Sequence, residues 1–337
     1  MKVFKLRLPR ARTIGKGRIM AFAIAGFMTL VSALPAALFA QADLSGLAGS
    51  TQAKFSDWSE AMNLGTVINS ASVDGCPFIS KNELCLYFAS NRTGGSGNLD
   101  IYVSKRAEVN DEWGQPENLG DINSSSAEFC PTLTTSGRYL FFVSDRPGGC
   151  GGQDLYVSRR SNKHDDSTWE APENLGCQVN SPFNDFTPSL FEDENGAVTL
   201  YFSSSRPGGQ GGTDIYASTL QVDGTFGPAV PVAELNTEKD DQRPNIRRDG
   251  LEIFFDSNRQ GSIAGSYDLW VSMRNKPSHA WSAPTNLGAN VNSGYLEGRP
   301  SISFDRKKLY FMSNRPDGSG NIDLYVTTRT KQHKGSN

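Results

Sequence analysis

The chain has 337 residues, of which 37% are hydrophobic and 20% charged, which suits a soluble globular protein and excludes a largely disordered one. Its 33 Lys and Arg and 36 Asp and Glu give a formal net charge of −3. Seven of the basic residues and none of the acidic ones lie in the first 18 positions, so the remainder carries 26 basic and 36 acidic residues. This negative charge argues against nucleic acid and anionic membrane surfaces as partners.

The first 42 residues predict a secretory signal peptide. A basic segment precedes the apolar run IMAFAIAGFMTLVSALPAALFA, and the sequence AQA ends at Ala42. An uncleaved membrane anchor is the alternative, because a run of 22 residues is just long enough to span a bilayer. No Cys precedes Cys76, which excludes a lipoprotein anchor. We expect cleavage after Ala42 or Ala40, no membrane span afterwards, and a periplasmic or secreted location in a bacterium.

Five copies of one repeat follow the signal segment. Each reads W-x-x-P-x-N-L-G, then an acid three residues before a Pro, an apolar hairpin, S-x-R, a glycine-rich turn and D-[IL]-[YW]. The opening aromatic recurs in steps of 55, 56, 57 and 55 residues, at Trp58, Trp113, Trp169, Phe226 and Trp281. The prolines are Pro77, Pro131, Pro188, Pro244 and Pro300. An Asn stands eight residues before each of them, at Asn69, Asn123, Asn180, Asn236 and Asn292.

The repeat predicts an all-β, five-bladed β-propeller with four antiparallel strands per blade. Short aromatic-rich runs bounded by Gly, Pro, Asn and Asp indicate about four strands per repeat, and radially repeated four-stranded sheets form propellers. The chain begins with an outer strand near Trp58 and ends with a third strand at Tyr325, so the N-terminal strand closes the last blade. An open solenoid would need atypical capping repeats, which neither end shows. We expect a signal peptide at 1–42, a lead at 43–57, the propeller at 58–329 and a tail at 330–337.

The signature S-[ND]-R-x-G-G-x-G-x-x-D-[IL]-Y and the acid-x-x-Pro element resemble the WD40-like repeats of TolB-type β-propellers from bacterial envelope proteins. The resemblance covers residues 58–329. It departs from TolB, which resembles a six-bladed propeller with an extra domain, because only five repeats are present. The peptidoglycan-binding domain that often accompanies such repeats is also lacking. The resemblance therefore implies the fold, and partners are not carried over from it.

The repeated polar residues are expected to serve the scaffold. The glycine-rich turn leads into a strand, whereas a phosphate loop opens a helix. An Asp opens each third strand and is either a calcium ligand or an acceptor of turn N–H groups; five near-identical copies favour the second interpretation. These residues are Asp100, Asp154, Asp214, Asp268 and Asp323.

The repeated tryptophans suit blade packing better than sugar stacking. We expect no metal and no cofactor, and the histidines at 164, 279 and 333 are too few for a zinc site or a Ser-His-Asp triad.

Ion pairs are predicted between the acid before each Pro and the arginine of S-x-R. A hairpin tip at Asn82 and Glu83 sets Phe78 opposite Tyr87 and Asp74 opposite Asn91, beside Arg92. Because the first strand of each blade is innermost, we expect the acids to ring one mouth of the central channel. The acids are Asp74, Glu128, Asp185, Asp241 and Glu297, and the arginines are Arg92, Arg146, Arg206, Arg259 and Arg315.

Five cysteines lie in the first half of the chain, where export would allow disulfides to persist. Cys150 and Cys177 belong to a turn and a connection on the same face of one blade, so they are the main candidate pair, with two free thiols as the alternative. Cys76 and Cys130, at equivalent positions of neighbouring inner strands, are a weaker candidate pair.

Function is expected where the copies differ. Arg243 and Arg299 precede the prolines of the fourth and fifth repeats, where the other repeats have Cys or Thr, and with Arg259 they are the candidate binding residues. The third repeat also inserts FEDENGAVT in its first hairpin. We expect a monomeric, non-catalytic propeller whose loop face binds an envelope or extracellular protein or a glycan. The alternative is a carbohydrate-active enzyme, similar to five-bladed glycoside hydrolases with two carboxylates about the axis. The repeated acids are equivalent, whereas such an enzyme needs two carboxylates in unlike surroundings, so we expect no catalytic residue.

Overall fold

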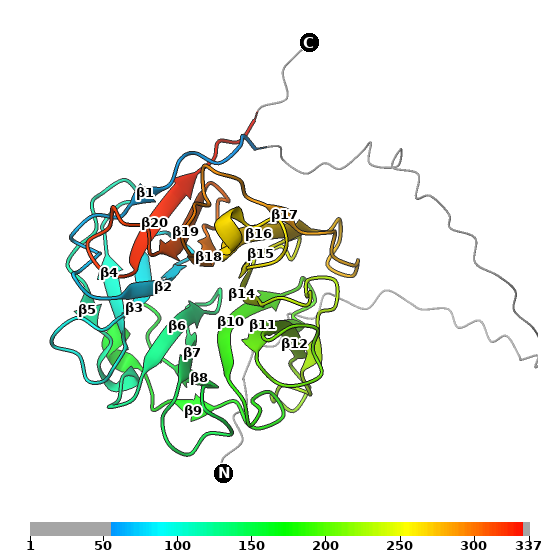
Figure 1. Ribbon diagram of the computed structural model, residues 1–337. Coiled ribbons are helices and arrows are strands. Elements are labelled where there is room, and N and C mark those ends of the chain that lie inside the picture. The colour runs from blue at the N-terminus through cyan, green and yellow to red at the C-terminus, as the bar shows by residue number, and fades with distance from the viewer. Residues whose placement is uncertain (1–54, 333–337) are drawn as a thin grey trace, which may run out of the picture. The chain divides into compact units, whose positions relative to one another are not determined.

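The computed structural model describes residues 55–332. Residues 1–54 and 333–337, which include the expected signal peptide, most of the lead and the end of the tail, lie outside it. The described chain forms five four-stranded antiparallel sheets arranged around one axis, which confirms the predicted five-bladed β-propeller (Figure 1). Helical structure in this range is limited to the 3-10 turns η2 (Gly120–Ile122), η3 (Asp166–Thr168) and η4 (Ile263–Gly265). No helix here has the length and apolar character needed to cross a membrane.

Each blade consists of an inner, a second, a third and an outer strand. The first blade contains β2 (Asp74–Ile79), β3 (Cys85–Ser90), β4 (Asp100–Lys105) and β5 (Glu117–Asn118). The second contains β6 (Glu128–Leu133), β7 (Tyr139–Ser144), β8 (Asp154–Arg159) and β9 (Glu173–Asn174). The third contains β10 (Asp185–Glu192), β11 (Val198–Ser204), β12 (Asp214–Thr219) and β13 (Val230–Pro231). The fourth contains β14 (Asp241–Ile246), β15 (Glu252–Ser257), β16 (Asp268–Met273) and β17 (Thr285–Asn286). The fifth contains β18 (Glu297–Ile302), β19 (Lys308–Ser313), β20 (Asp323–Thr328) and, from the N-terminal side, β1 (Met62–Asn63).

The two ends of the described chain meet in the fifth blade, as the sequence predicts. Strand β1 pairs with β20, with Met62 opposite Val326 and Asn63 opposite Tyr325. An isolated bridge between Phe55 and Lys331 extends the pairing. The outer strands are only two residues long and follow the W-x-x-P segment instead of coinciding with it. Trp58 itself packs in the core under the guanidinium of Arg329, whose Cζ lies 4.5 Å from the ring centroid.

The S-x-R arginine joins three parts of its blade. In the first blade the Arg92 guanidinium lies 5.1 Å from the ring centroids of both Phe88 and Tyr102. Its Nη2 donates to the Asp74 carboxylate and to the Ile68 carbonyl oxygen, both at 2.6 Å. All five blades pair acid and arginine in this way: Arg92 with Asp74 at 2.6 Å, Arg146 with Glu128 at 3.1 Å, Arg206 with Asp185 at 2.6 Å, Arg315 with Glu297 at 2.8 Å, and Arg259 with Asp241. The repeated pair therefore stabilises each blade.

The expectation that these acids ring the channel mouth is corrected by the structure. All five carboxyl side chains are fully buried, and in the first blade Asp74 also accepts hydrogen bonds from the amide and hydroxyl of Ser70. Phe78 faces Tyr87 as expected, but Asp74 faces Ser90 because a β-bulge between Gly75 and Phe78 shifts the register by one residue. The residue before each Pro adopts a positive φ of 50–56°, at Cys76, Cys130, Thr187, Arg243 and Arg299. The acids are therefore buried within their blades and are not exposed at a channel mouth.

The Asp that opens each third strand accepts hydrogen bonds from backbone amides of the preceding turn. Asp214 accepts from Gln210 and Gly211 at 2.9 and 3.1 Å, and Asp323 accepts from Ser319 and Gly320. A Cβ at Gly209 would stand 1.8 Å from the Asp214 carboxylate, so the turn requires glycine there. No group of three or more metal-ligating side chains occurs in residues 55–332. The Asp side chain therefore stabilises the backbone of the turn that precedes its strand.

Candidate functional site: an axial pocket

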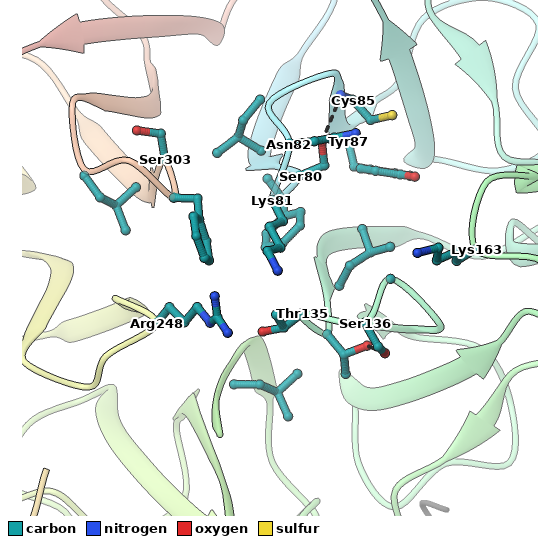
Figure 2. Close-up of a pocket in the computed structure, with 18 of the residues that line it drawn as sticks. Ser80, Lys81, Asn82, Cys85, Tyr87, Thr135, Ser136, Lys163, Arg248 and Ser303 are labelled. Atoms are coloured by element: carbon teal, nitrogen blue, oxygen red, sulfur yellow. Dashed lines mark hydrogen bonds between the residues drawn. The ribbon is translucent and has the colours of Figure 1, made fainter. Parts of the chain in front are cut away.

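A cavity of about 810 Å³ opens at the axis, on the side where hairpins join the inner and second strands (Figure 2). All five blades contribute to it, and two sets of contributing positions are equivalent from blade to blade. The residue two positions after the repeated Pro is apolar in every blade. Together these residues form the floor of the cavity: Ile79, Leu133, Leu190, Ile246 and Ile302. The residue four positions after each of these prolines lies in or next to the hairpin turn: Lys81, Thr135, Glu192, Arg248 and Phe304. We call these five residues the tip ring.

The tip ring is where the repeats differ in chemistry. Its members, in blade order, are a cation, a hydroxyl, a carboxylate, a second cation and an aromatic ring. The floor beneath them is uniformly apolar, so the blades form equivalent backbone positions with unlike side chains at the opening. A pocket with an apolar base and a few convergent polar groups is the usual form of a small-ligand site. The tip ring therefore gives the symmetric scaffold one asymmetric pocket.

Asp166, on the 3-10 turn η3, brings a carboxylate to the pocket from outside the repeat. Its Oδ1 accepts hydrogen bonds from the Tyr87 hydroxyl at 2.9 Å and from the Arg160 guanidinium. Its Oδ2 lies 3.1 Å from the Lys105 ammonium. Burial and the Asp166 charge raise the pKa of Tyr87 well above its usual value, so its hydroxyl keeps the proton that it donates. Two cations and one neutral donor thus hold this carboxylate in place.

Glu192 is the second carboxylate that lines the pocket. It ends β10 and is exposed at the tip of the third blade, inside the segment FEDENGAVT that this repeat alone inserts. Among residues 55–332, no cation lies within ion-pair distance of its side chain. Glu192 and Asp166 therefore occupy unlike surroundings, one free and one held by three donors.

Two cations of the tip ring approach the same aromatic ring. The Lys81 Nζ lies 5.1 Å and the Arg248 Cζ 4.7 Å from the centroid of Phe304, whose blade stands between theirs. Figure 2 shows Lys81 and Arg248 pointing toward the middle of the pocket, with Lys163 reaching in from another blade. Cation–π contacts hold these side chains at the opening without neutralising them.

Cys85 is the free cysteine of the described range and also lines the pocket, as Figure 2 shows. Burial, followed by the Asp166 charge, raises the pKa of its thiol. The other four cysteines are joined in pairs. Cys150 is bonded to Cys177 with 5.6 Å between their Cα atoms, and Cys76 to Cys130 with 4.7 Å. Both candidate pairs from the sequence are thus brought together.

Below the floor, the residues that precede the prolines close the channel. Cys76, Cys130, Thr187 and Arg299 are each less than a tenth exposed, and the disulfide joins the first two. Arg299 reaches from the fifth blade to the second, where its Nη2 donates to Thr132 Oγ1 at 3.0 Å and to the Pro131 carbonyl at 3.1 Å. Burial lowers the pKa of Arg299 to about 9. The pocket therefore has a solid base.

The candidate binding arginines are not placed on a loop face, which corrects their assignment. Arg299 is fully buried, and Arg259 is buried in its ion pair with Asp241. Arg243 pairs at 2.7 Å with Asp256, whose other oxygen accepts the Arg299 amide at 3.0 Å. Burial raises the pKa of Asp256, and the Arg243 charge opposes that shift. Arg259 therefore serves the repeated ion pair, and Arg243 and Arg299 share the buried carboxylate of Asp256.

No family model matches the chain, and a search of curated proteins finds no relative. Solved structures share its fold at low identity. An α-L-arabinofuranosidase from Podospora anserina in complex with cellotriose is 11% identical with a TM-score of 0.54, covering 81% of this chain and 98% of its own. An α-L-arabinofuranosidase from Lactobacillus brevis is 13% identical with a TM-score of 0.54, covering 80% and 93%. A family 43 endo-arabinanase from Bacillus licheniformis is 14% identical with a TM-score of 0.51, covering 80% and 96%.

These comparisons correct the expectation of a non-catalytic propeller. The three structures described above are of glycoside hydrolases, and at 11–14% identity they show a fold that this chain shares with such enzymes. A putative TolB from Agrobacterium tumefaciens also matches, with 13% identity, a TM-score of 0.48 and coverage of 83% and 100%. The propeller architecture that the TolB-type resemblance implied is shown by the five four-stranded sheets themselves.

Sequence reasoning missed Asp166, Glu192 and the other pocket residues because it looked for chemistry in the repeated acids. Those acids are equivalent, and the structure uses all five in ion pairs. The available signal was the position four residues after each Pro, where the five copies carry five residue types. Asp166 had no such signal, because it lies in a segment between the third and outer strands that differs from repeat to repeat.

Proposed function

We propose that this protein is a carbohydrate-active enzyme that hydrolyses a glycosidic bond of a glycan bound in the axial pocket. The observation that carries the proposal is that two carboxylates in unlike surroundings, Asp166 and Glu192, line one cavity of about 810 Å³. Glycoside hydrolysis uses such a pair, one as an acid and the other as a base or nucleophile. The fold shared with glycoside hydrolases supports a sugar as the ligand class.

The two carboxylates take different roles because their contacts differ. Lys105 and Arg160 hold the Asp166 carboxylate in a fixed position, which suits a group that activates water or stabilises positive charge at the anomeric carbon. Glu192 has no such cation and faces the open pocket, so it is the candidate proton donor to the leaving oxygen. In the reaction, the bond between the anomeric carbon and the leaving oxygen breaks, and Glu192 gives its proton to that oxygen. Water adds its hydroxyl to the anomeric carbon and gives its other proton to Asp166.

The test is release of reducing ends from a panel of glycans by the wild-type chain and two matched variants. Glu192→Gln removes the candidate acid, whereas Glu194→Gln changes an exposed residue of the same inserted segment that does not line the pocket. General acid catalysis contributes roughly 10²–10⁴-fold, so we expect at least a hundredfold loss in the first variant and full activity in the second. Equal activity of the two variants would overturn the proposal.

We also propose that residues 1–42 direct export to the periplasm or the outside of a bacterium. The two disulfides support this, because such bonds persist in oxidising compartments. Mass spectrometry of the chain recovered from periplasm and culture medium tests it. A mature N-terminus at Asp43 or Gln41 is expected, and recovery of the intact chain from the cytoplasm alone would refute it.

A further inference from the structure

The axial pocket is strongly basic although the protein is acidic. Six of the residues that line it are Lys or Arg and only two are Asp or Glu. Three of the cations are already neutralised, because Lys105 and Arg160 contact Asp166 and Arg247 contacts Glu252 at 2.7 Å. The other three are Lys81, Lys163 and Arg248, and none has a carboxylate within ion-pair distance in residues 55–332. The pocket thus carries unbalanced positive charge at its opening.

Lys81 and Arg248 are brought together by their shared contact with Phe304. Both lie within 5.1 Å of one ring centroid, and both point into the pocket. Because both cations contact one ring, their like charges repel each other, and the aromatic ring offsets only part of that repulsion. An oxyanion placed between an ammonium and a guanidinium would remove it and would accept hydrogen bonds from both.

We propose that the pocket takes an anionic saccharide, whose carboxylate or sulfate oxygen atoms bind between Lys81 and Arg248. This inference rests on the proposed function for the choice of a sugar, and it goes beyond it by assigning the charge of that sugar. The apolar floor, including Ile79 and Ile302, offers the ring a nonpolar surface, and the Thr135 hydroxyl offers a polar contact.

The tip ring also orients the sugar. In blade order, Arg248, Phe304 and Lys81 form one continuous arc, and Thr135 and Glu192 form the remainder. An anionic group bound on the cationic arc leaves the rest of the sugar on the side of Glu192. The same arc that selects the charge therefore turns the sugar toward the candidate acid.

The test is calorimetric binding to the Glu192→Gln chain, which keeps the pocket and prevents turnover. Trigalacturonic acid supplies carboxylates, sulfated galactotriose supplies sulfates, and galactotriose supplies neither. We expect one or both anionic probes to bind at least tenfold more tightly than galactotriose, and the difference to shrink as salt screens the charges. Binding of galactotriose as tight as that of both anionic probes would overturn the inference.

A double variant, Lys81→Gln with Arg248→Gln, locates the anion site. We expect at least a tenfold loss of affinity for the anionic probe. Lys239→Gln with Lys276→Gln removes two exposed charges outside the pocket and should leave affinity unchanged. Equal losses in both double variants would overturn the assignment to this pocket.

The two proposals can fail independently. Cleavage of neutral glycans alone would refute this inference and keep the proposed function. Anion binding together with turnover that does not depend on Glu192 would refute the proposed function and keep this inference.

Discussion

Asn69 holds Leu324 at the seam where the two ends of the propeller meet. The Asn69 Oδ1 accepts the Leu324 amide at 2.8 Å, and its Nδ2 donates to the Leu324 carbonyl at 3.0 Å. Asn123 makes the same pair of bonds to Ile101 within an unbroken part of the ring. Since each buried group left without a partner costs about 1–3 kcal/mol, Asn69→Leu should lower the free energy of unfolding by about 2 kcal/mol or more.

The matched variant Asn123→Leu distinguishes ring closure from general destabilisation. It should lower the free energy of unfolding by a similar amount, because it loses the same two bonds. Only Asn69→Leu should make the segment near β1 more sensitive to limited proteolysis, since that segment is held by the seam. Equal cleavage patterns in the two variants would contradict the role of Asn69 in closure.

Asp185→Asn should destabilise the fold and spare the pocket. Asp185 is fully buried and pairs with Arg206 at 2.6 Å, and neither residue lines the cavity. Removing one partner leaves the other charge unpaired, at a cost of about 3 kcal/mol, measurable by urea unfolding. Ligand binding by the folded fraction should be unchanged. Loss of binding or activity with unaltered stability would show that the repeated acids have a functional role.

The disulfide between Cys150 and Cys177 should stabilise the second blade. It closes a loop of 27 residues, for which chain-entropy arguments give about 3.5 kcal/mol. The double variant Cys150→Ser with Cys177→Ser should lose about that much in chemical unfolding, whereas Cys85→Ser, which breaks no bond, should not. Peptide mapping without reductant that found Cys150 unlinked would contradict the assignment.

Cys85 should react slowly with iodoacetamide at neutral pH. Burial and the Asp166 charge raise the pKa of its thiol, so the reactive thiolate is a smaller fraction than in a free cysteine at the same pH. The rate should therefore keep rising with pH beyond the usual thiol pKa, and a ligand in the pocket should slow it. Mass spectrometry of the labelled peptide measures the rate. A rate equal to that of N-acetylcysteine would contradict the raised pKa.

Blade number and strand order were predictable because the repeat marks are local and evenly spaced. The outer aromatic, the Asn and the S-x-R arginine each recur once per blade, so their phase also predicts that the N-terminal strand completes the fifth sheet. The bulge before each Pro was not predictable by counting. Cys76 and Arg299 adopt the same positive φ although they share no chemistry, so no residue type signals it.

The pocket could not be predicted from the sequence, for a related reason. Repeated motifs attract attention because they recur, yet the tip ring is defined by a position at which nothing recurs. Glu192 and Lys81 hold equivalent places in two blades, but only the closed ring brings their side chains to one cavity. Their common function depends on contacts between chain segments more than 100 residues apart, which spacing alone does not reveal.

The buried crossing from Arg299 to Thr132 has a consequence for the shape of any substrate. Arg299 reaches from the fifth blade to the second and is fully buried, so we expect a substrate to enter and leave the pocket on the hairpin side. A long polysaccharide cannot thread through the axis or slide along it between successive cuts. For an enzyme that works as proposed, only a chain terminus or a side branch fits, so products should appear as short sugars while the polymer shortens slowly.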